Sequence, residues 1–124
     1  MAVKRPERPV VCLLGDGETL MGAGSLWSFA GLRPANLLVA ILDDGHYTIT
    51  GGQELGAPTA FAEVAAALGL ASAVAETAEE IGAQVRSLPR PGLLVMRYTD
   101  RVWPGPSPFV DPARVRLRFE AAAS

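Results

Sequence analysis

The sequence predicts a small doubly wound α/β domain, in which a parallel sheet has helices on both faces. Three observations predict this fold. Four apolar runs are bounded by Gly, Pro or polar residues, as strands usually are. Three of these runs are apolar nearly throughout instead of alternating with polar residues, which is typical of strands buried on both faces. Helical segments separate the runs, so strands and helices alternate along the chain.

Each element has its own local signal. The predicted strands are Val10–Leu14, Leu37–Leu42, Ala71–Ala75 and Gly92–Tyr98. The predicted helices are Met21–Leu32, Thr59–Leu68, Thr77–Leu88 and Asp111–Ala122. Thr77 is followed three residues later by Glu80, a pattern typical of a capping box. Asp111 precedes Pro112, so the last helix is expected to begin with an aspartate cap and a first-turn proline. A stiff proline-rich connection, Trp103–Pro108, comes before that helix.

Length and composition restrict the classes of protein to consider. The 124 residues suffice for one packed core, so we expect a single domain over residues 1–124. A hydrophobic content of 49% with 19% charged residues argues against a disordered chain. A net charge of −2 with scattered Lys and Arg offers no basic stripe for a phosphate backbone, so no nucleic-acid partner is expected.

The single cysteine and the lack of long apolar runs predict a cytoplasmic protein. Cys12 alone can form neither an internal disulfide, nor a thiolate zinc site, nor an iron–sulfur cluster, and it lies in an apolar strand as a core residue would. A reducing compartment is therefore expected. No apolar run approaches the roughly 20 residues that a membrane span needs, so no membrane partner is expected either.

The loop after the first strand combines glycines with an acid. Its residues are Gly15, Asp16, Gly17, Glu18 and Thr19. Glycines let a backbone turn sharply and approach a ligand, and the start of a helix presents free N–H groups to an anion. A carboxylate facing a diphosphate would nevertheless repel it unless a divalent cation lay between them. Asp16 therefore indicates a metal ion.

A second acidic loop follows the second strand. It contains Asp43, Asp44, Gly45, His46 and Tyr47. One crossover helix and one strand separate the two loops, which places both at the carboxyl edge of a parallel sheet, where ligands of such folds bind. Two acidic loops at one edge supply the oxygen ligands that Mg²⁺ prefers, with phosphate oxygens and water completing its shell.

The Gly15-Asp16-Gly17 triplet, this spacing and the acidic pair together resemble the signature of thiamine diphosphate enzymes. The resemblance implies that Asp16 is a magnesium ligand, that Asp44 is the second side-chain ligand, and that the His46 backbone carbonyl is the third. Gly15 and Gly17 would admit the diphosphate. The resemblance thus implies thiamine diphosphate and Mg²⁺ as cofactors.

The resemblance continues beyond the acidic pair. The stretch from Tyr47 to Gln53 is similar to the TGGQ-containing segment of phosphonopyruvate and sulfopyruvate decarboxylases. Gly51, Gly52 and Gln53 either face the cofactor or substrate, or order as a loop onto the metal site. Two interpretations also stay open for Glu18 and Thr19, which either cap the first helix or reach a phosphate. The remaining cofactor-binding candidate is Tyr47.

The sequence also departs from the family pattern. Asp44 stands where asparagine is common, which keeps an oxygen ligand and adds a charge. Asp43 is interpreted as a residue that caps or orients the loop, not as a ligand. For the imidazole of His46, the only histidine, a loop side chain without a chemical role is preferred over a general acid or base. No residue of this chain is assigned as catalytic.

Two parts that the resemblance requires are not found in the sequence. The family's diphosphate domains begin with a further strand and helix that carry a glycine-rich segment, so the domain is expected to be a truncated form of the thiamine diphosphate-binding fold, incomplete at its N-terminal side. The glutamate that activates the cofactor belongs to a separate pyrimidine-binding domain. The resemblance therefore implies a hetero-oligomer with a chain that supplies that domain. This interpretation is preferred over the alternative that the chain is a fragment or an inactive relative.

The resemblance implies the small subunit of a thiamine diphosphate-dependent 2-oxoacid decarboxylase or carboligase, a lyase active only with its partner chain. Its substrate would be a small 2-oxoacid. One alternative is the β-type component of a 2-oxoacid oxidoreductase, against which the single cysteine argues, since a cluster needs about four thiolates. Another is a non-catalytic interaction domain that retains the fold. A nucleotide-binding domain of the Rossmann type is disfavoured, because Asp16 lies where a dinucleotide needs bare backbone amides.

Overall fold

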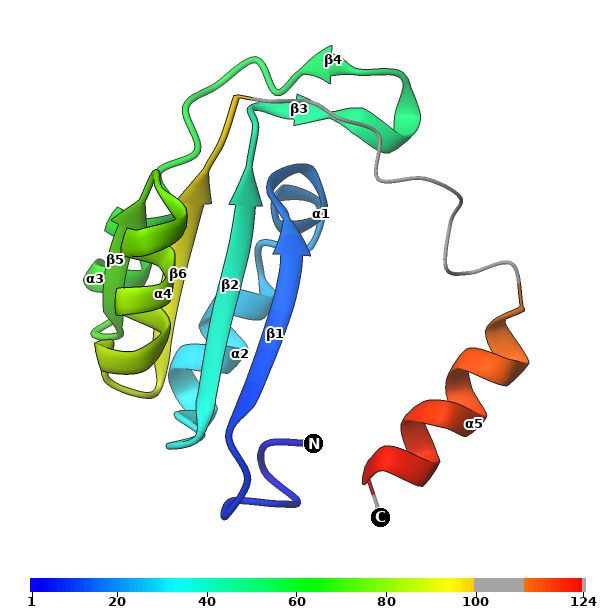
Figure 1. Cartoon of the computed structure of the whole chain (residues 1–124). Coiled ribbons are helices and arrows are strands. Elements are labelled where there is room, and N and C mark those ends of the chain that lie inside the picture. Colours follow the sequence, from blue (N-terminus) through cyan, green and yellow to red (C-terminus); the bar gives the residue numbers. More distant parts are fainter. Residues whose placement is uncertain (100–110, 124) are drawn as a thin grey trace.

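The computed structural model describes residues 1–99 and 111–123, and in this part of the chain it confirms the predicted α/β fold with a parallel sheet (Figure 1). The strands of the sheet are β1 (Val10–Gly15), β2 (Leu37–Asp43), β5 (Ala71–Ala75) and β6 (Gly92–Arg97). They are all parallel, in the order β1-β2-β6-β5. Their carboxyl ends therefore share one edge, at the top of Figure 1.

Helices cover both faces of this sheet. One face packs against α2 (Ser25–Leu32) and α3 (Phe61–Ala67), in a core that includes Leu26, Phe29, Phe61, Val39 and Ile41. The other face packs against α4 (Ala78–Ser87), whose Ile81 and Val85 lie against Leu38, Ala40, Leu94 and Met96. The central strands β2 and β6 are thus covered from two sides, which explains why their sequences are apolar without alternation.

The edge strand β1 is covered on one face only. Cys12 and Leu14 pack against the core formed with α2 and α3. On the opposite face Val11 and Leu13 are 54% and 60% exposed. The prediction that both faces are covered therefore holds at the centre of the sheet and fails at β1, because α4 lies over β5, β6 and part of β2 and does not cover β1.

Two predicted helix boundaries were wrong. In place of one helix over Met21–Leu32, the chain forms α1 (Asp16–Met21) and then α2, with Gly22 and Gly24 between them. Glycine disfavours a helix interior by about 1 kcal/mol relative to alanine, so a pair of glycines ends the first helix early. The second predicted helix, Thr59–Leu68, begins at Phe61 instead of Thr59, whose hydroxyl donates to Asp43 instead of lying in the helix.

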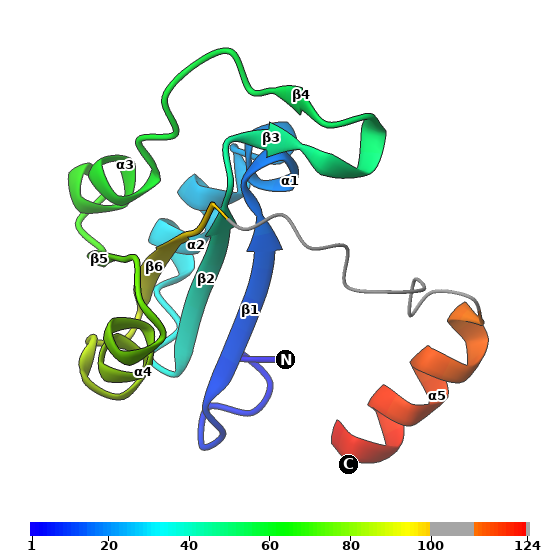
Figure 2. The same cartoon turned by 45° about the horizontal axis from the view of Figure 1, so that its top comes forward.

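A small hairpin, which was not predicted from the sequence, lies above the carboxyl edge of the sheet. It consists of β3 (His46–Tyr47), the 3₁₀ turn η1 (Thr48–Thr50) and β4 (Gln53–Glu54), and its two short strands pair antiparallel. Figure 2 shows β3 lying over α1. The hairpin thus brings the segment after the second acidic loop back over the first.

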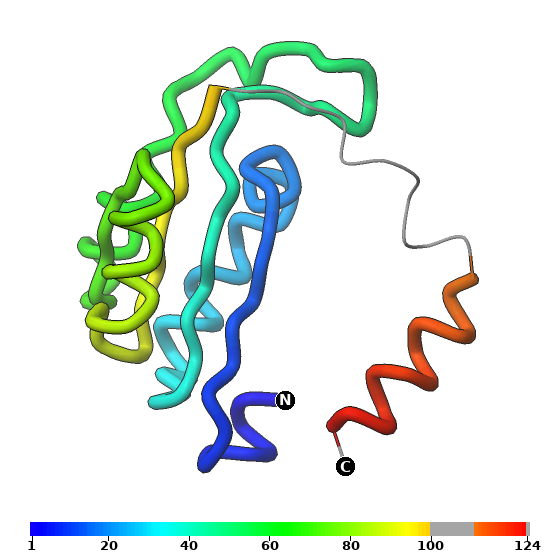
Figure 3. Tube along the Cα trace, in the orientation of Figure 1, coloured from blue at the N-terminus to red at the C-terminus, as the bar shows by residue number. Residues whose placement is uncertain are grey.

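The last helix, α5 (Pro112–Ala123), lies apart from the sheet in Figures 1 and 2. The backbone N–H of Arg114 donates to Asp111 Oδ1 at 3.0 Å, which confirms the predicted aspartate cap. Its C-terminal end lies near the N-terminal segment (Figure 3), where the Arg5 guanidinium donates to the Ala123 carbonyl at 3.4 Å. The predicted connection Trp103–Pro108 lies outside the described residues.

None of the helices in residues 1–99 and 111–123 has the length and apolar character of a membrane span.

Candidate cofactor and metal site

The two acidic loops lie side by side at the carboxyl edge of the sheet. Because β1 and β2 are parallel neighbours, Gly15 is the register partner of Leu42. Asp16 therefore begins α1 next to the end of β2, where Asp43 is the last residue. The two loops meet, as their spacing predicted.

Asp16 joins the first loop to the second. The residue is 4% exposed, and its carboxylate accepts three backbone N–H groups. Oδ1 accepts from Gly17 at 2.7 Å, while Oδ2 accepts from Asp44 at 3.1 Å and from Gly45 at 2.7 Å. Hydrogen bonds to a charged group typically contribute about 1.5–3 kcal/mol each. The carboxylate is therefore held in a fixed orientation against the backbone of the second loop.

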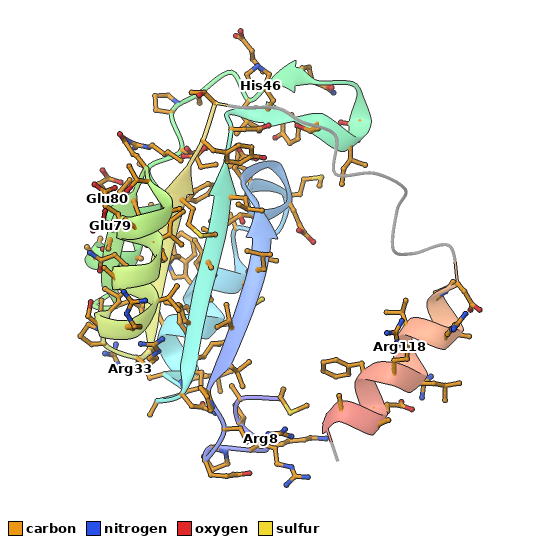
Figure 4. The ribbon with its side chains drawn as sticks, in the orientation of Figure 1. Arg8, Arg33, His46, Glu79, Glu80 and Arg118 are labelled. Carbon is orange, nitrogen blue, oxygen red and sulfur yellow. The ribbon has the colours of Figure 1, made fainter. Side chains whose placement is uncertain are left out.

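Asp44 organises the start of the hairpin. Its Oδ1 accepts the backbone N–H of His46 at 3.0 Å, and its Oδ2 accepts the Thr48 hydroxyl at 3.0 Å. The His46 ring Nδ1 lies 2.7 Å from the Asp44 carbonyl oxygen. Figure 4 shows His46 at this end of the molecule, above the carboxyl ends of the strands. The imidazole is thus engaged locally, with the backbone of its own loop.

A hollow of about 190 Å³ opens between the N-terminal end of α1 and the hairpin. The residues predicted to bind the cofactor that line it are Gly15, Asp16, Gly17, Glu18, Asp44, His46 and Tyr47. All three predicted metal ligands are among them. In the described part of the chain, no three His, Cys, Asp or Glu side chains come close enough together to hold a metal ion. A cation in this hollow would therefore combine the two aspartates with carbonyl oxygens and with oxygens from outside the chain.

Gly17 is in tight contact with Tyr47. A β-carbon added at Gly17 would lie 2.6 Å from Tyr47 Cδ1, well inside van der Waals contact. The tyrosine ring of β3 therefore packs directly on the backbone at the start of α1, and α1 and β3 contact each other. This gives Gly17 a structural role that is separate from admitting a phosphate.

Thr19 and Glu18 both bond to Gly15. The Thr19 hydroxyl donates to the Gly15 carbonyl at 2.7 Å, and the residue is 3% exposed. Glu18 is exposed and lines the hollow, and its Oε2 accepts the Gly15 N–H at 3.4 Å. Both side chains stabilise the first turn of α1, and a phosphate contact by either of them stays a prediction.

Gly51, Gly52 and Gln53 form the far end of the hairpin and do not line the hollow. The two glycines have φ values of +136° and +77°, which side chains rarely adopt. Gly52 donates its N–H to the Tyr47 carbonyl at 2.9 Å and closes the turn. Here the glycines serve the turn, and direct contact with a cofactor stays a prediction.

Asp43 is the last residue of β2 and is buried. Its Oδ2 accepts the Thr59 hydroxyl at 2.8 Å and lies 3.7 Å from Arg97 Nε. Burial raises the pKa of the Asp43 carboxyl above its ordinary value, and the neighbouring Asp16 acts in the same direction, while the Thr59 hydroxyl and the Arg97 charge oppose the rise. Thr59 and Arg97 were not predicted as site residues, because they belong to neither motif. Only the fold brings them to this edge.

Apolar side chains border the hollow as well. Met21, Leu42, Ile49 and Tyr98 line it, and each is at least 38% exposed. Met21, Leu42 and Tyr98 lie in predicted helix and strand segments, where an apolar residue is ordinarily interpreted as part of the core. Their position at the mouth of the hollow was therefore not apparent from the sequence.

This chain is similar in sequence to decarboxylases from other organisms. A phosphonopyruvate decarboxylase from Streptomyces viridochromogenes is 36% identical over 122 residues, which cover 92% of this chain and 30% of that protein. Sulfopyruvate decarboxylase subunit beta from Methanocaldococcus jannaschii is 36% identical over 76 residues, which cover 60% of this chain and 40% of that subunit. The chain thus spans less than half the length of either relative.

A solved structure shows the same fold. The thiamine diphosphate-dependent 4-hydroxybenzoylformate decarboxylase of Rhodococcus jostii RHA1 superposes with a TM-score of 0.62 at 24% identity, over 82% of this chain and 22% of that one. Residues 1–95 match the family described as thiamine pyrophosphate enzyme, C-terminal TPP binding domain. With its parallel sheet, its two acidic loops at one edge and this match, the chain belongs to the family of C-terminal, cofactor-binding domains of thiamine diphosphate enzymes.

Proposed function

We propose that this chain anchors the diphosphate of thiamine diphosphate through Mg²⁺, as the small subunit of a 2-oxoacid decarboxylase or carboligase. The observation that carries the proposal is the position of Asp16. Its buried carboxylate accepts N–H groups from both acidic loops and lines a hollow shared with Asp44 and His46. In this proposal Asp16, Asp44 and the His46 carbonyl hold the ion.

The donor set suits the proposed groups. Carboxylate and carbonyl oxygens are hard ligands, which Mg²⁺ prefers. Softer metal ions prefer sulfur or imidazole ligands. Gly15 adds no side chain to the wall of the hollow, and a β-carbon there would meet no atom within 4 Å. When bound, thiamine diphosphate supplies the carbanion chemistry, and this chain binds and orients its charged end.

A partner chain is part of the proposal. The β subunit from M. jannaschii belongs by name to an enzyme with more than one subunit, and the S. viridochromogenes relative carries much more chain than the part matched here. The exposed apolar side chains at the hollow, together with Val11 and Leu13 on the open face of β1, form the kind of surface that usually marks an interface. We propose that the partner supplies the pyrimidine-binding domain and closes the hollow.

The names of the same relatives support a proposal for the substrate class. Both are named for the decarboxylation of a substituted pyruvate, which is why we propose a small 2-oxoacid for this chain. The single cysteine is consistent with a reducing compartment, and we place the protein in the cytoplasm.

The proposal is tested by thermal shift of the full chain with thiamine diphosphate plus Mg²⁺, compared with NAD plus Mg²⁺ and ATP plus Mg²⁺. A ligand that binds only the folded chain raises its melting temperature by mass action. We expect a rise with thiamine diphosphate that disappears when EDTA replaces Mg²⁺. An equal or larger rise with ATP or NAD would refute the proposal.

A further inference from the structure

Asp43 is a buried acid that the proposed ligand set does not use. It is 7% exposed at the end of β2, and its backbone carbonyl accepts the Tyr98 N–H at 3.1 Å, which fixes it to the chain just after β6. A carboxylate removed from water is costly unless it is paired or hydrogen-bonded. The contacts of Asp43 therefore indicate what keeps it there.

The strongest of these contacts is with Thr59. The Thr59 hydroxyl donates to Asp43 Oδ2 at 2.8 Å, a normal length for a hydrogen bond to a carboxylate. Arg97 Nε lies 3.7 Å from the same oxygen, too far for a hydrogen bond, and its side chain is half exposed and shared with Glu76. The hydroxyl defines the geometry, and the arginine contributes a weaker attraction.

The Asp43–Thr59 bond closes a loop. The chain leaves the sheet at Asp43, forms the hairpin, and returns at Thr59 just before α3. Residues 44–58 lie between these two points and include two of the proposed metal ligands. The Leu55 N–H also donates to the Gly45 carbonyl at 2.9 Å at the base of this loop, next to the antiparallel pairing of β3 with β4. Gly45 also donates to Asp16, so both ties act on the backbone that meets the first acidic loop.

We infer that Asp43 is a positioning residue: by accepting the Thr59 hydroxyl it closes the loop 44–58 and so holds Asp44 and His46 against Asp16. This inference rests on the proposed function for its consequence, because the loop carries two of the proposed ligands. It assigns to Asp43 no contact with the cation. A role through charge alone, or as a direct ligand, would not involve the hydroxyl of Thr59.

The test uses variants that separate the hydrogen bond from the charge. Thr59→Val removes the hydroxyl at nearly constant volume, Thr59→Ser keeps it, and Asp43→Asn keeps an acceptor oxygen while removing the charge. Thr77→Val is the matched control, because it removes a threonine hydroxyl that accepts the Glu80 N–H at 3.2 Å in an exposed helix cap outside the loop 44–58.

The first measurement is hydrogen exchange in the full chain without metal. The amides of His46, Gly52 and Leu55 donate bonds within the loop. We expect Thr59→Val to speed their exchange about tenfold, the effect of losing one hydrogen bond to a charged group, and Thr59→Ser and Thr77→Val to leave it unchanged. Unchanged exchange in Thr59→Val would overturn the inference. If circular dichroism shows that Thr59→Val does not fold, the exchange rates of Thr59→Ala, which lacks the hydroxyl, and Thr59→Ser, which keeps it, are compared instead. Equal rates in these two variants would overturn the inference.

The second measurement is a Mn²⁺ titration followed by electron paramagnetic resonance in the presence of thiamine diphosphate. We expect Thr59→Val to weaken Mn²⁺ binding about tenfold and Asp43→Asn to stay within about threefold of the wild type. The reverse pattern, with Asp43→Asn impaired and Thr59→Val normal, would show a role through charge and overturn the inference. If the wild type takes up no Mn²⁺ with thiamine diphosphate, the proposed function fails, and the exchange measurement still decides the role of Asp43.

Discussion

The start of α4 and the start of α1 use acidic side chains in the same way but over very different distances. At α4, Glu80 Oε2 accepts the N–H groups of Glu76 at 2.9 Å and Thr77 at 3.3 Å, all within one exposed turn (Figure 4). At α1, Asp16 is buried and accepts the N–H of Gly45, which lies 29 residues away. The arrangement at α4 stabilises one helix, whereas the arrangement at α1 joins the loop after β1 to the loop after β2.

The pKa values of the acids in the two regions move in opposite directions. Bonds from the backbone N–H groups of Glu76 and Thr77 lower the pKa of Glu80, which is fully exposed. Burial raises the pKa of Asp43, the acid beside Asp16. The helix cap thus stabilises the ionised form of Glu80, whereas burial at the sheet edge destabilises the ionised form of Asp43. An acid kept at such a cost is typical of a functional site.

The largest expected effect is that of Asp16→Ala on stability. The substitution leaves the N–H groups of Gly17, Asp44 and Gly45 without their shared acceptor. We expect a loss of about 3 kcal/mol in the free energy of unfolding, measured by urea denaturation. A loss below about 0.5 kcal/mol would mean that Asp16 joins the loops no more tightly than an exposed cap does.

Gly17→Ala is expected to have the next largest effect. Its methyl group would lie 2.6 Å from Tyr47 Cδ1, and such overpacking costs about 2 kcal/mol. Gly24→Ala is the matched control, because Gly24 has ordinary helical angles and a β-carbon there would meet no atom within 4 Å. If the clash is the cause, Gly17→Ala should become nearly neutral when Tyr47 is also replaced by alanine. An undiminished cost in that double variant would contradict the account.

Thr77→Ala tests the local side of the comparison. Loss of a threonine N-cap costs about 1 kcal/mol, and this one accepts the Glu80 N–H at 3.2 Å. The loss should appear in urea denaturation, and hydrogen exchange at the amides of Gly45 and Leu55 should not change. Faster exchange at those amides would show that the two regions are coupled.

The smallest expected effects concern pH and have opposite signs. Because the pKa of Glu80 is lowered in the folded chain, its contribution to stability is present above its unfolded pKa and is lost as the pH falls through the folded value. Because the pKa of Asp43 is raised, its contribution is greatest at acid pH and is lost as the pH rises through the folded value.

The melting temperatures of two variants, measured between pH 3 and pH 8, should therefore depend on pH in opposite ways. Glu80→Gln should lower stability at neutral pH and approach the wild type at acid pH. Asp43→Asn should raise the stability of the metal-free chain at neutral pH and lose this advantage at acid pH. Equal pH dependence in both variants would contradict the assigned directions.

The same contrast explains what the sequence could predict. The cap of α4 and the aspartate cap of α5 follow from residues within four positions of each other, and both were predicted. The central strands β2 and β6 could be predicted from continuous apolar runs, because burial on both faces removes the alternation of apolar and polar residues. Asp16 was found because its motif combines an unusual charge with glycines at a strand end.

The meeting of the two acidic loops was predicted from their spacing, but other features of the fold were not. The hairpin over the site is held by bonds such as Leu55 N–H to the Gly45 carbonyl, and its strands have two residues each, too short to show a period. Thr59 reads as the start of a helix until Asp43 is placed beside it. The break between α1 and α2 depended on two glycines that a helical pattern can tolerate.

The most direct test of the central claim is calorimetric titration of thiamine diphosphate into the full chain, with Mg²⁺ and with EDTA, for the wild type and Asp16→Asn. The asparagine keeps one acceptor oxygen for the second loop but removes the charge that a cation needs. The account predicts binding by the wild type only with Mg²⁺, and binding at least about tenfold weaker in Asp16→Asn. Binding that persists in EDTA, or that is unchanged in Asp16→Asn, would contradict it.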